Sequence, residues 1–282
     1  MFHRFSDCVA FPTFFQRGTA LCLLTALLLG PASPSGRAGE PAADEITQVS
    51  VINALLLGQY QGTFPVQELS KLGNLGLGTF DHLDGELILL DGVVYQAKSD
   101  GTVHRCDKTM TTPFAVATPF EGEVKFTCPA VGSLEQLEAV LKSHVPPADA
   151  FVAIRIDATF ESVSLRAVPR QEPPFLPLAE VVKTQSQWKR EHIQGTLIGI
   201  RCPAWVTGIG IPGYHWHFLS KDLKSGGHVF DCSFTSAEVA FDRCRTWVIK
   251  LDESLEQSGR NLNQDLSKEL DQVERQRGTP GR

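Results

Sequence analysis

The stretch GYHWHFLSKDLKSGGHVF, residues 213–230, holds three of the chain's eight histidines in two strand-like runs. His215 and His217 are two residues apart, so on a strand their side chains lie on the same face. The polar loop between the runs can fold a second strand back and bring His228 beside them. Three neutral imidazoles with an open fourth position are typical of catalytic zinc. The pattern therefore predicts a zinc-binding hairpin, although histidines hydrogen-bonded in a half-buried strand are the simpler alternative.

Strand-like runs dominate the chain on both sides of this hairpin. Three Asp-Gly pairs, at residues 84–85, 91–92 and 100–101, separate β-rich runs, which indicates a β-meander. Many strands with few helices predict an α+β fold with mixed or antiparallel sheets. Further strands are expected at 46–51, 123–128, 151–156, 161–168, 195–201 and 245–250, and helices at 65–72, 133–144, 177–190 and 263–276.

The first 42 residues differ from the rest of the chain. Arg4 and Arg17 precede an apolar run at 19–29, and small, helix-breaking residues follow at 30–39. This is the layout of an export signal, and the apolar run is too short to span a bilayer comfortably. We expect residues 1–42 to be an export signal and flexible leader, which predicts a periplasmic or secreted protein. Without a functional leader the protein would be cytoplasmic.

The globular part divides near residue 147, where Pro146 and Pro147 follow the predicted helix 133–144. We therefore expect an N-terminal β-sheet domain at 43–147 and a C-terminal metal-binding domain at 148–282. The net charge of −6 offers no basic footprint for nucleic acid and no polybasic anchor for a stable membrane association. Five cysteines follow the leader, an odd number without C-x-x-C, so a disulfide scaffold is not indicated.

Two other motifs compete with the zinc interpretation. Residues 208–213 match G-x-G-x-x-G, but a dinucleotide site needs a helix next, whereas Pro212 and the histidine strand follow here. A cupin would also supply His-x-His, yet it requires a glutamate shortly afterwards on the same strand. The five residues after His217 contain none. The dinucleotide site is therefore rejected, and a cupin-like metalloenzyme is weakened but stays open.

Three charged residues lie on apolar strands. Glu86 alternates with Ile88 and Leu90, which turns its carboxylate toward their apolar face, although an exposed turn glutamate fits equally well. Arg155 and Arg166 occupy two strands of the second half. Such arginines are usually salt-bridge partners at a sheet edge, but one that faces a cavity would bind a carboxylate through its planar fork.

Four segments together closely resemble the acetolactate decarboxylase family. They are GLGTFDHLDGE (76–86), AIRID (153–157), RAVPRQE (166–172) and the histidine stretch with the glycines before it, and they occur in family order. The resemblance covers the chain from about Ile46 to its end. It implies a homodimer whose subunits have two β-sheet domains with the active site between them. It also implies zinc-dependent decarboxylation of 2-acetolactate to acetoin and CO2 through a metal-stabilised enediolate.

The resemblance assigns roles to individual residues. It makes His215, His217 and His228 the Zn²⁺ ligands. Glu86 and Arg166 are similar to the family's catalytic residues, and Thr79 and Arg166 to those that bind substrate. A glutamate from the C-terminal tail also reaches the metal in this family. The expected residue is Glu274, with Glu269 as the rival. An exported protein that binds zinc or a small acid without turnover remains the alternative outside the enzymes, and iron or manganese also suits three histidines.

Overall fold

The computed structural model describes residues 42–107, 109–251, 255 and 259–275, all of which belong to one compact unit. The predicted export signal lies outside these residues except for Ala42, so export stays a prediction. No helix within the described ranges is long and apolar enough to cross a membrane. The five cysteines that follow residue 42 are all free thiols.

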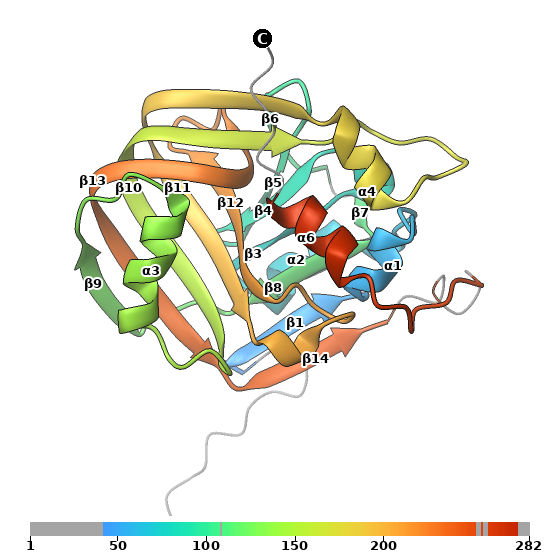
Figure 1. Cartoon of the computed structure of the whole chain (residues 1–282), viewed down its shortest axis with the longest axis horizontal. Helices are drawn as coiled ribbons and strands as arrows, with labels where there is room; N and C mark the ends of the chain where they lie inside the picture. The colour runs from blue at the N-terminus through green and yellow to red at the C-terminus, as the bar shows by residue number, and fades with distance from the viewer. Residues whose placement is uncertain (1–41, 108, 252–254, 256–258, 276–282) are drawn as a thin grey trace, which may run out of the picture. The chain divides into compact units, whose positions relative to one another are not determined.

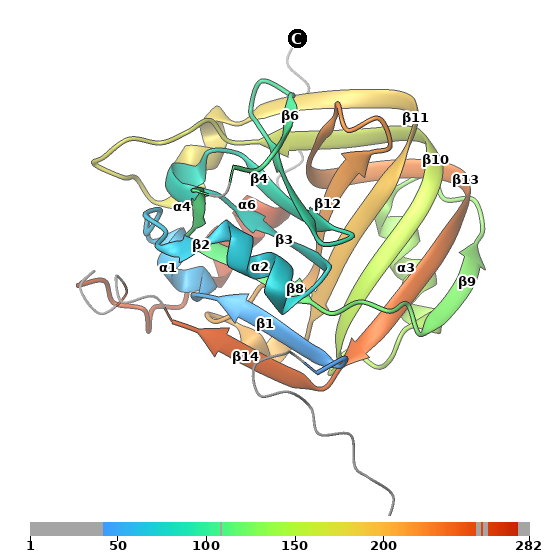
Figure 2. The ribbon, with the colours of Figure 1, turned by 180° about the vertical axis from the view of Figure 1, so that it is seen from behind.

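A seven-stranded sheet forms one layer of the molecule (Figures 1 and 2). Its order is β14-β1-β8-β3-β4-β5-β6, and every neighbouring pair is antiparallel except β1 with β14, which run parallel. The strands are β1 (Glu45–Val49), β3 (Leu75–Thr79), β4 (Glu86–Leu90), β5 (Val93–Ala97), β6 (Val103–Arg105), β8 (Phe114–Thr118) and β14 (Thr246–Lys250).

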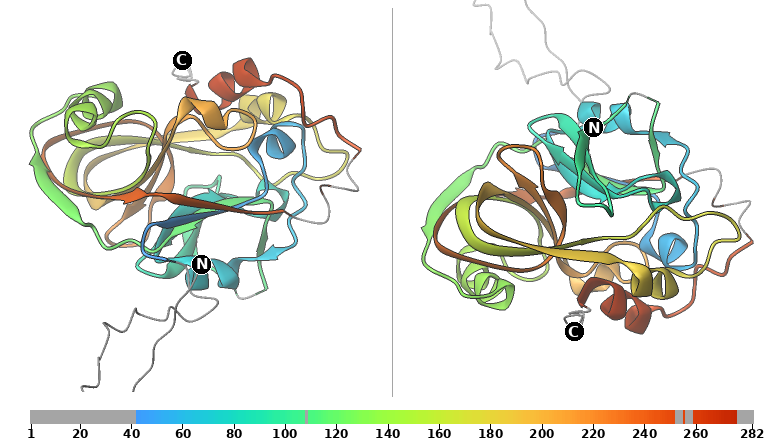
Figure 3. Two further views of the ribbon diagram at one scale, coloured as in Figure 1. Left: turned by 90° about the horizontal axis from the view of Figure 1, so that it is seen from below. Right: turned by 90° about the horizontal axis from the view of Figure 1, so that it is seen from above.

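A five-stranded antiparallel sheet, in the order β10-β11-β12-β13-β9, carries the histidines. Because β13 also pairs with β10, the strands β10 to β13 close into a ring, which the views along the vertical direction show (Figure 3). The strands are β9 (Val124–Cys128), β10 (Phe151–Ala167), β11 (Ser186–Cys202), β12 (Gly213–Ser220) and β13 (Gly226–Cys244).

Side chains of β12 alternate between two environments. Trp216 and Phe218 are buried in an apolar cluster with Phe160 and Phe234, where aromatic rings meet edge to face. Successive strand residues point to opposite faces, so the histidines at 215 and 217 must point away from that cluster. The alternation that fills the ring with aromatic groups therefore also presents the imidazoles to the seven-stranded sheet.

The helices are short and lie around the two sheets (Figure 1). Ser133 caps the longest one by accepting a hydrogen bond from the backbone of Gln136, as the sequence predicted. The helices are α1 (Ile52–Leu56), α2 (Val66–Leu72), α3 (Leu134–His144), α4 (Leu178–Val181) and α6 (Ser267–Arg275), with 3-10 turns η1 (Asp81–Leu83), η2 (Val182–Thr184) and η3 (Ala204–Val206) and a small sheet of β2 (Phe64–Pro65) and β7 (Thr111–Thr112).

The α+β prediction is confirmed in that strands dominate and a few helices accompany them. The meander is present as β4-β5-β6, and its first turn has φ of 53° at Asp91 and 76° at Gly92, as tight hairpin turns require. The histidine hairpin is present as β12-β13, with His217 directly opposite His228. The predicted helices at 65–72 and 133–144 agree with α2 and α3, and the terminal helix α6 begins later, at Ser267.

Two element predictions were wrong. The strands expected at 151–156 and 161–168 are one continuous strand, β10, with irregular pairing to β13 between Ala158 and Ser162. The helix expected at 177–190 stops at Thr184, and β11 begins at Ser186. Residues 186–191 alternate between half-buried and exposed, and they pair along β10. Pairing with a distant strand therefore overrides the local preference of this segment.

The sheets exchange strands across the predicted boundary at residue 147. β9 precedes that boundary but pairs with β13, whereas β14 follows it and pairs with β1. The crossing between β8 and β9 is held by the buried carboxylate of Asp242. This group accepts hydrogen bonds from the backbone N–H groups of residues 121, 122 and 123, at 2.6, 3.0 and 2.5 Å. The division into two domains stays a prediction.

Candidate metal centre and active site

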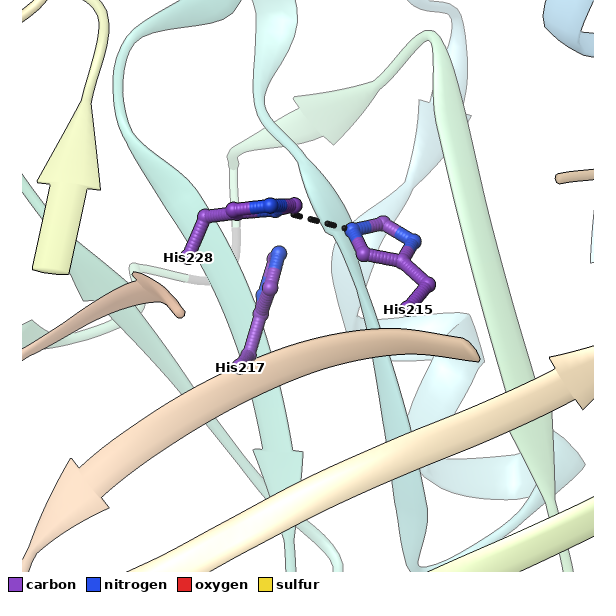
Figure 4. A group of neighbouring side chains, drawn as sticks. All are labelled: His215, His217 and His228. Atoms are coloured by element: carbon purple, nitrogen blue, oxygen red, sulfur yellow. Dashed lines mark hydrogen bonds between the residues drawn. The ribbon is translucent and has the colours of Figure 1, made fainter. Parts of the chain in front are cut away.

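Three histidines converge between β12 and β13 (Figure 4). His215 and His217 come from β12 and His228 from β13, and all three are buried. Their ligand atoms lie within 4.8 Å of one another, and Nε2 of His215 is 3.1 Å from Nδ1 of His228. The pairing of His217 with His228 brings these rings together, as the sequence predicted. The three side chains are therefore spaced to bind one ion.

A backbone carbonyl fixes the tautomer of His217. Its Nδ1 lies 2.8 Å from the carbonyl oxygen of Leu87 on β4. A carbonyl only accepts, so Nδ1 carries the proton and Nε2 keeps its lone pair. That Nε2 atom is buried and has no hydrogen-bond partner among the described residues. A metal-binding histidine usually donates its other N–H in this way, so the orphaned Nε2 is suited to a metal.

Burial keeps the three imidazoles neutral. It lowers the pKa of His215 to about 3, and the nearby Arg166 guanidinium adds to the effect. Burial also holds the pKa of His217 and of His228 well below the ordinary value for histidine. Neutral imidazole is the form that binds metal ions. Three buried, neutral nitrogen donors therefore fit a divalent metal such as zinc.

Two glutamates approach the histidines, one from β4 and one from α6. Glu86, the first residue of β4, has Oε2 3.5 Å from His217 Nε2. Glu274, on α6, has Oε2 4.0 Å from His215 Nε2 and 3.9 Å from His228 Nε2. Burial raises the pKa of Glu86 to about 8, and the charge of Glu274 adds to this rise while Arg166 opposes it. Glu86 therefore holds a proton near neutral pH.

Arg166 supplies the positive charge of the site. It lies on β10 directly opposite His228, and only 5% of it is exposed. Its Nη1 donates to Oε1 of Gln185 at 2.9 Å, while its Nε has no partner in the described part of the chain. Burial lowers its pKa, but the carboxyl groups of Glu274 and Glu86 act against that shift. A buried guanidinium with an unused donor is suited to an anionic ligand.

Arg155, the other candidate arginine, has a structural role. Its Nη1 lies 2.7 Å from Asp91 and its Nε 2.7 Å from Asp157. Asp157 also accepts a hydrogen bond from Thr196 on the neighbouring strand. Both acidic partners are well exposed. This is the usual salt-bridge role of a strand arginine, and it distinguishes Arg155 from Arg166.

A cavity of about 60 Å³ joins these groups. Thr79 on β3 is directly opposite Glu86 on β4. Its hydroxyl donates to the carbonyl of Gly85 at 3.0 Å, so the hydroxyl oxygen can still accept a hydrogen bond. Most of the remaining wall is apolar and includes Ile52 and Leu178. The polar residues that border the cavity are Thr79, Glu86, Arg166, His215, His228 and Glu274, with Gln185 beside them.

The structure brings the predicted residues together and separates the two tail glutamates. Glu274 borders the cavity, whereas Glu269 is half-exposed and lies outside it. Sequence reasoning missed Gln185, because it falls inside the helix wrongly expected at 177–190. No local signal marked the carbonyl of Leu87 either. The carboxyl groups come from β4 and α6 rather than from β12, which is not the cupin pattern. The glycines at 208–213 lead into β12 with no helix after them.

Comparison with known proteins identifies the family of the chain. The family model described as alpha-acetolactate decarboxylase matches residues 46–264. The chain belongs to this family. The alpha-acetolactate decarboxylase of Methanosarcina mazei is 41% identical over 234 residues, covering 83% of this chain and 81% of the relative. That of Bacillus subtilis is 36% identical over 240 residues, covering 85% of this chain and 94% of the relative.

The fold agrees with the family as well. The crystal structure of the Bacillus subtilis enzyme matches with a TM-score of 0.79 at 36% identity, covering 82% of this chain and 100% of that chain. Because the family consists of decarboxylases, the chain is an enzyme of the carboxy-lyase type. The sequence resemblance to the family is therefore confirmed.

The lowered histidine pKa values predict how the metal-free protein responds to acid. Below pH 6.5 the unfolded chain binds protons on these histidines, while the folded protein does not. The contribution of these neutral histidines to the free energy of unfolding is therefore fully present above pH 6.5, and it is lost as the pH falls below that value. His215→Gln should reduce the loss between pH 7 and pH 5 by about 2 kcal/mol. Urea unfolding with a chelator at both pH values measures this, and the opposing contribution of Glu86 is common to both proteins.

An equal loss in wild type and His215→Gln would show that His215 is protonated in the folded protein, contrary to the assignment of neutral metal ligands.

Proposed function

We propose that this chain catalyses the zinc-dependent decarboxylation of 2-acetolactate to acetoin and CO2 through an enediolate. One observation carries the proposal. The imidazoles of His215 and His228, two carboxyl groups and one buried guanidinium border a small cavity whose other walls are mostly apolar, and the His217 imidazole lies beside the other two. The substrate offers matching groups, namely a carboxylate, a hydroxyl, a ketone and two methyl groups. Membership of the alpha-acetolactate decarboxylase family supports the same substrate.

His215, His217 and His228 would hold the zinc ion. When bound, zinc supplies positive charge beside the substrate oxygens and so stabilises the negative charge that develops on the ketone oxygen. Arg166 binds the substrate carboxylate, because its buried Nε lacks another partner in the described chain. Gln185 holds the guanidinium in place through Nη1. The apolar wall excludes water from the carbon that becomes electron-rich.

The reaction needs one proton at a defined carbon. When the bond to the carboxylate breaks, its electron pair forms the double bond of the enediolate, and CO2 leaves. Protonation of the carbon that lost CO2 then gives acetoin. Glu86 is the proton donor in our proposal, because its carboxyl group borders the cavity and lies 3.5 Å from His217 Nε2. In the metal-free protein, burial raises the pKa of this carboxyl group. Glu274, whose carboxyl group lies near His215 and His228, assists in proton transfer or metal binding.

The first test is acetoin formation from racemic 2-acetolactate by the purified protein. Turnover should disappear on treatment with a chelator and return on addition of zinc, because the histidines bind the ion that stabilises the developing charge. His217→Gln should lose both zinc and activity, whereas the exposed His144→Gln should keep both. A folded, zinc-loaded protein that forms no acetoin would contradict the proposal and would favour a zinc-binding protein without turnover.

A second test concerns Glu86. Glu86→Gln keeps the shape of the side chain but removes the acidic proton, so kcat should fall by about 100-fold or more. Zinc should remain bound, because the three histidines are unchanged, and metal analysis of the purified variant measures this. The control is Glu238→Gln, an exposed position on β13. Full activity of Glu86→Gln would remove Glu86 from the mechanism.

We further propose that the protein is a homodimer in which a second copy covers β14. β14 is an edge strand of the seven-stranded sheet. Beside it the exposed side chains include Trp205 at 62% and Leu251 at 69%, and Trp205 packs against Trp247 of β14. An exposed apolar edge of this kind is suited to pairing between identical chains.

The oligomeric state tests the dimer. Light scattering on the wild type should give the mass of two chains, and Trp205→Asp should shift it toward one, because a charge would be buried at the interface. Leu176→Lys, which changes an exposed residue outside this edge, should remain dimeric. A wild type that is monomeric at micromolar concentration would contradict the proposal.

Export through residues 1–42 is likewise proposed, and the N-terminal sequence of the protein recovered from cells tests it.

A further inference from the structure

Residues 259–266, here called the strap, run across α1 before the chain enters α6. The side-chain amide of Asn53 binds the strap. Its Nδ2 donates to the carbonyls of Leu262 and Gln264 at 2.9 and 3.0 Å. Only 4% of Asn53 is exposed, and both bonds are partly buried. One buried side chain from the first half of the chain therefore fixes two points of the C-terminal segment.

The strap binds back to the same region through Arg260. Its Nε donates to the carbonyl of Leu57 at 2.8 Å, and its Nη2 to that of Gly58 at 3.2 Å. Its Nη1 donates to the side chain of Gln59 at 2.8 Å. Charged donors make stronger hydrogen bonds than neutral ones. Residues 53–59 and the strap are therefore joined by hydrogen bonds donated in both directions, from Asn53 to the strap and from Arg260 to residues 57–59.

The strap leads directly into the helix that carries Glu274. α6 has nine residues and would be marginal as an isolated helix. It buries Leu270 and Val273, and Leu266 at the end of the strap is buried as well. Gln272 donates to the carbonyl of Ala179 on α4. Apolar packing is not directional, so it limits the position of a helix less strictly than hydrogen bonds do. The hydrogen bonds of the strap therefore add to the bond of Gln272 and to that between His228 and the Glu274 backbone in setting the position of α6 along its axis.

Asn53 itself is fixed to the segment that precedes the metal strand. The backbone N–H of Asn53 donates to the carbonyl of Gly208 at 3.3 Å, and that of Ile52 to the carbonyl of Ile209 at 2.9 Å. This segment continues into β12, which carries two of the histidines. A continuous series of hydrogen bonds and short chain segments thus connects the histidine strand, Asn53, the strap and α6.

We propose that Asn53 is a positioning residue that sets the place of Glu274 over His215 and His228. It does so by holding the two strap carbonyls, while its own backbone is held by the segment before β12. The inference extends the proposed function, because Glu274 matters only where the histidine site acts. A carboxyl group displaced by about 1 Å can cost a large part of the activity.

Gln48 provides a matched control. It is 1% exposed, and its side-chain amide also donates to two backbone carbonyls, those of Ser50 and Ile209, both at 2.8 Å. It lies five residues before Asn53, and the two bonds of its amide lead to residues 50 and 209 rather than to the strap. Loss of the Asn53 amide removes the side-chain donor of the Leu262 and Gln264 carbonyls, and loss of the Gln48 amide removes that of Ser50, while the Ile209 carbonyl still accepts from the backbone of Ile52. Both Asn53→Ala and Gln48→Ala should therefore destabilise the fold. Only Asn53→Ala should change the activity through Glu274.

The experiment is a double-mutant cycle on the full chain. Asn53→Ala should lower kcat/KM for acetoin formation by about 10- to 100-fold, in the range found for residues that orient active-site groups. In a Glu274→Ala background the same substitution should cause almost no further loss, because its target is already absent. Gln48→Ala should have an equal effect in both backgrounds. An equal effect of Asn53→Ala in both backgrounds would overturn the proposal.

Hydrogen exchange of the metal-free protein gives an independent readout. Asn53→Ala should speed amide exchange in residues 267–275, and Gln48→Ala should not. Unchanged exchange there in a folded Asn53→Ala variant would overturn the proposal, even if wild type forms no acetoin and the proposed function fails. Should Asn53→Ala not fold, Arg260→Ala removes the strap bonds from the other side and is expected to give the same exchange and the same cycle.

Discussion

The hydrogen bond from His217 Nδ1 to the carbonyl of Leu87 is the contact on which the site depends. It joins β12 of one sheet to β4 of the other. It also decides which nitrogen of His217 keeps a lone pair, and it places that nitrogen 3.5 Å from the carboxyl group of Glu86. A single bond therefore links the two sheets, sets the tautomer of a candidate metal ligand and lies beside the carboxyl group that approaches it. If the His217 ring pointed away from Leu87, the link between the sheets, the defined tautomer and the contact with Glu86 would all be lost.

Charge balance explains why so many ionisable groups share one buried place. Arg166 carries the positive charge, and Glu274 and Glu86 lie close enough to it to counter the effect of burial on its pKa. Glu86 in turn is driven toward its protonated form. The three imidazoles remain neutral. The site avoids an uncompensated buried charge through these adjustments, and each one prepares a group for the proposed chemistry: a carboxylate receptor, a proton donor and metal ligands.

Local patterns predicted what depends on local spacing. The two-residue period placed His215 and His217 on one face, and Asp-Gly turns marked the meander. The helix expected at 177–190 failed because β11 gains its stability from β10, far away in sequence. Periodicity alone also did not separate Arg166 from Arg155, since the difference is whether acidic partners meet the guanidinium. The family resemblance indicated Glu274, while Gln185 and Asn53 act through long-range contacts that no short motif records.

The parallel pairing of β14 with β1 has a consequence for the order of events during synthesis. β1 is made among the first residues of the globular part, yet one of its edges has no strand until residues 246–250 have been synthesised. The same holds for β9, which waits for β13. Contacts that span most of the chain form slowly. Neither sheet is complete on a partial chain, so the nascent protein presents open strand edges until almost its entire length is available.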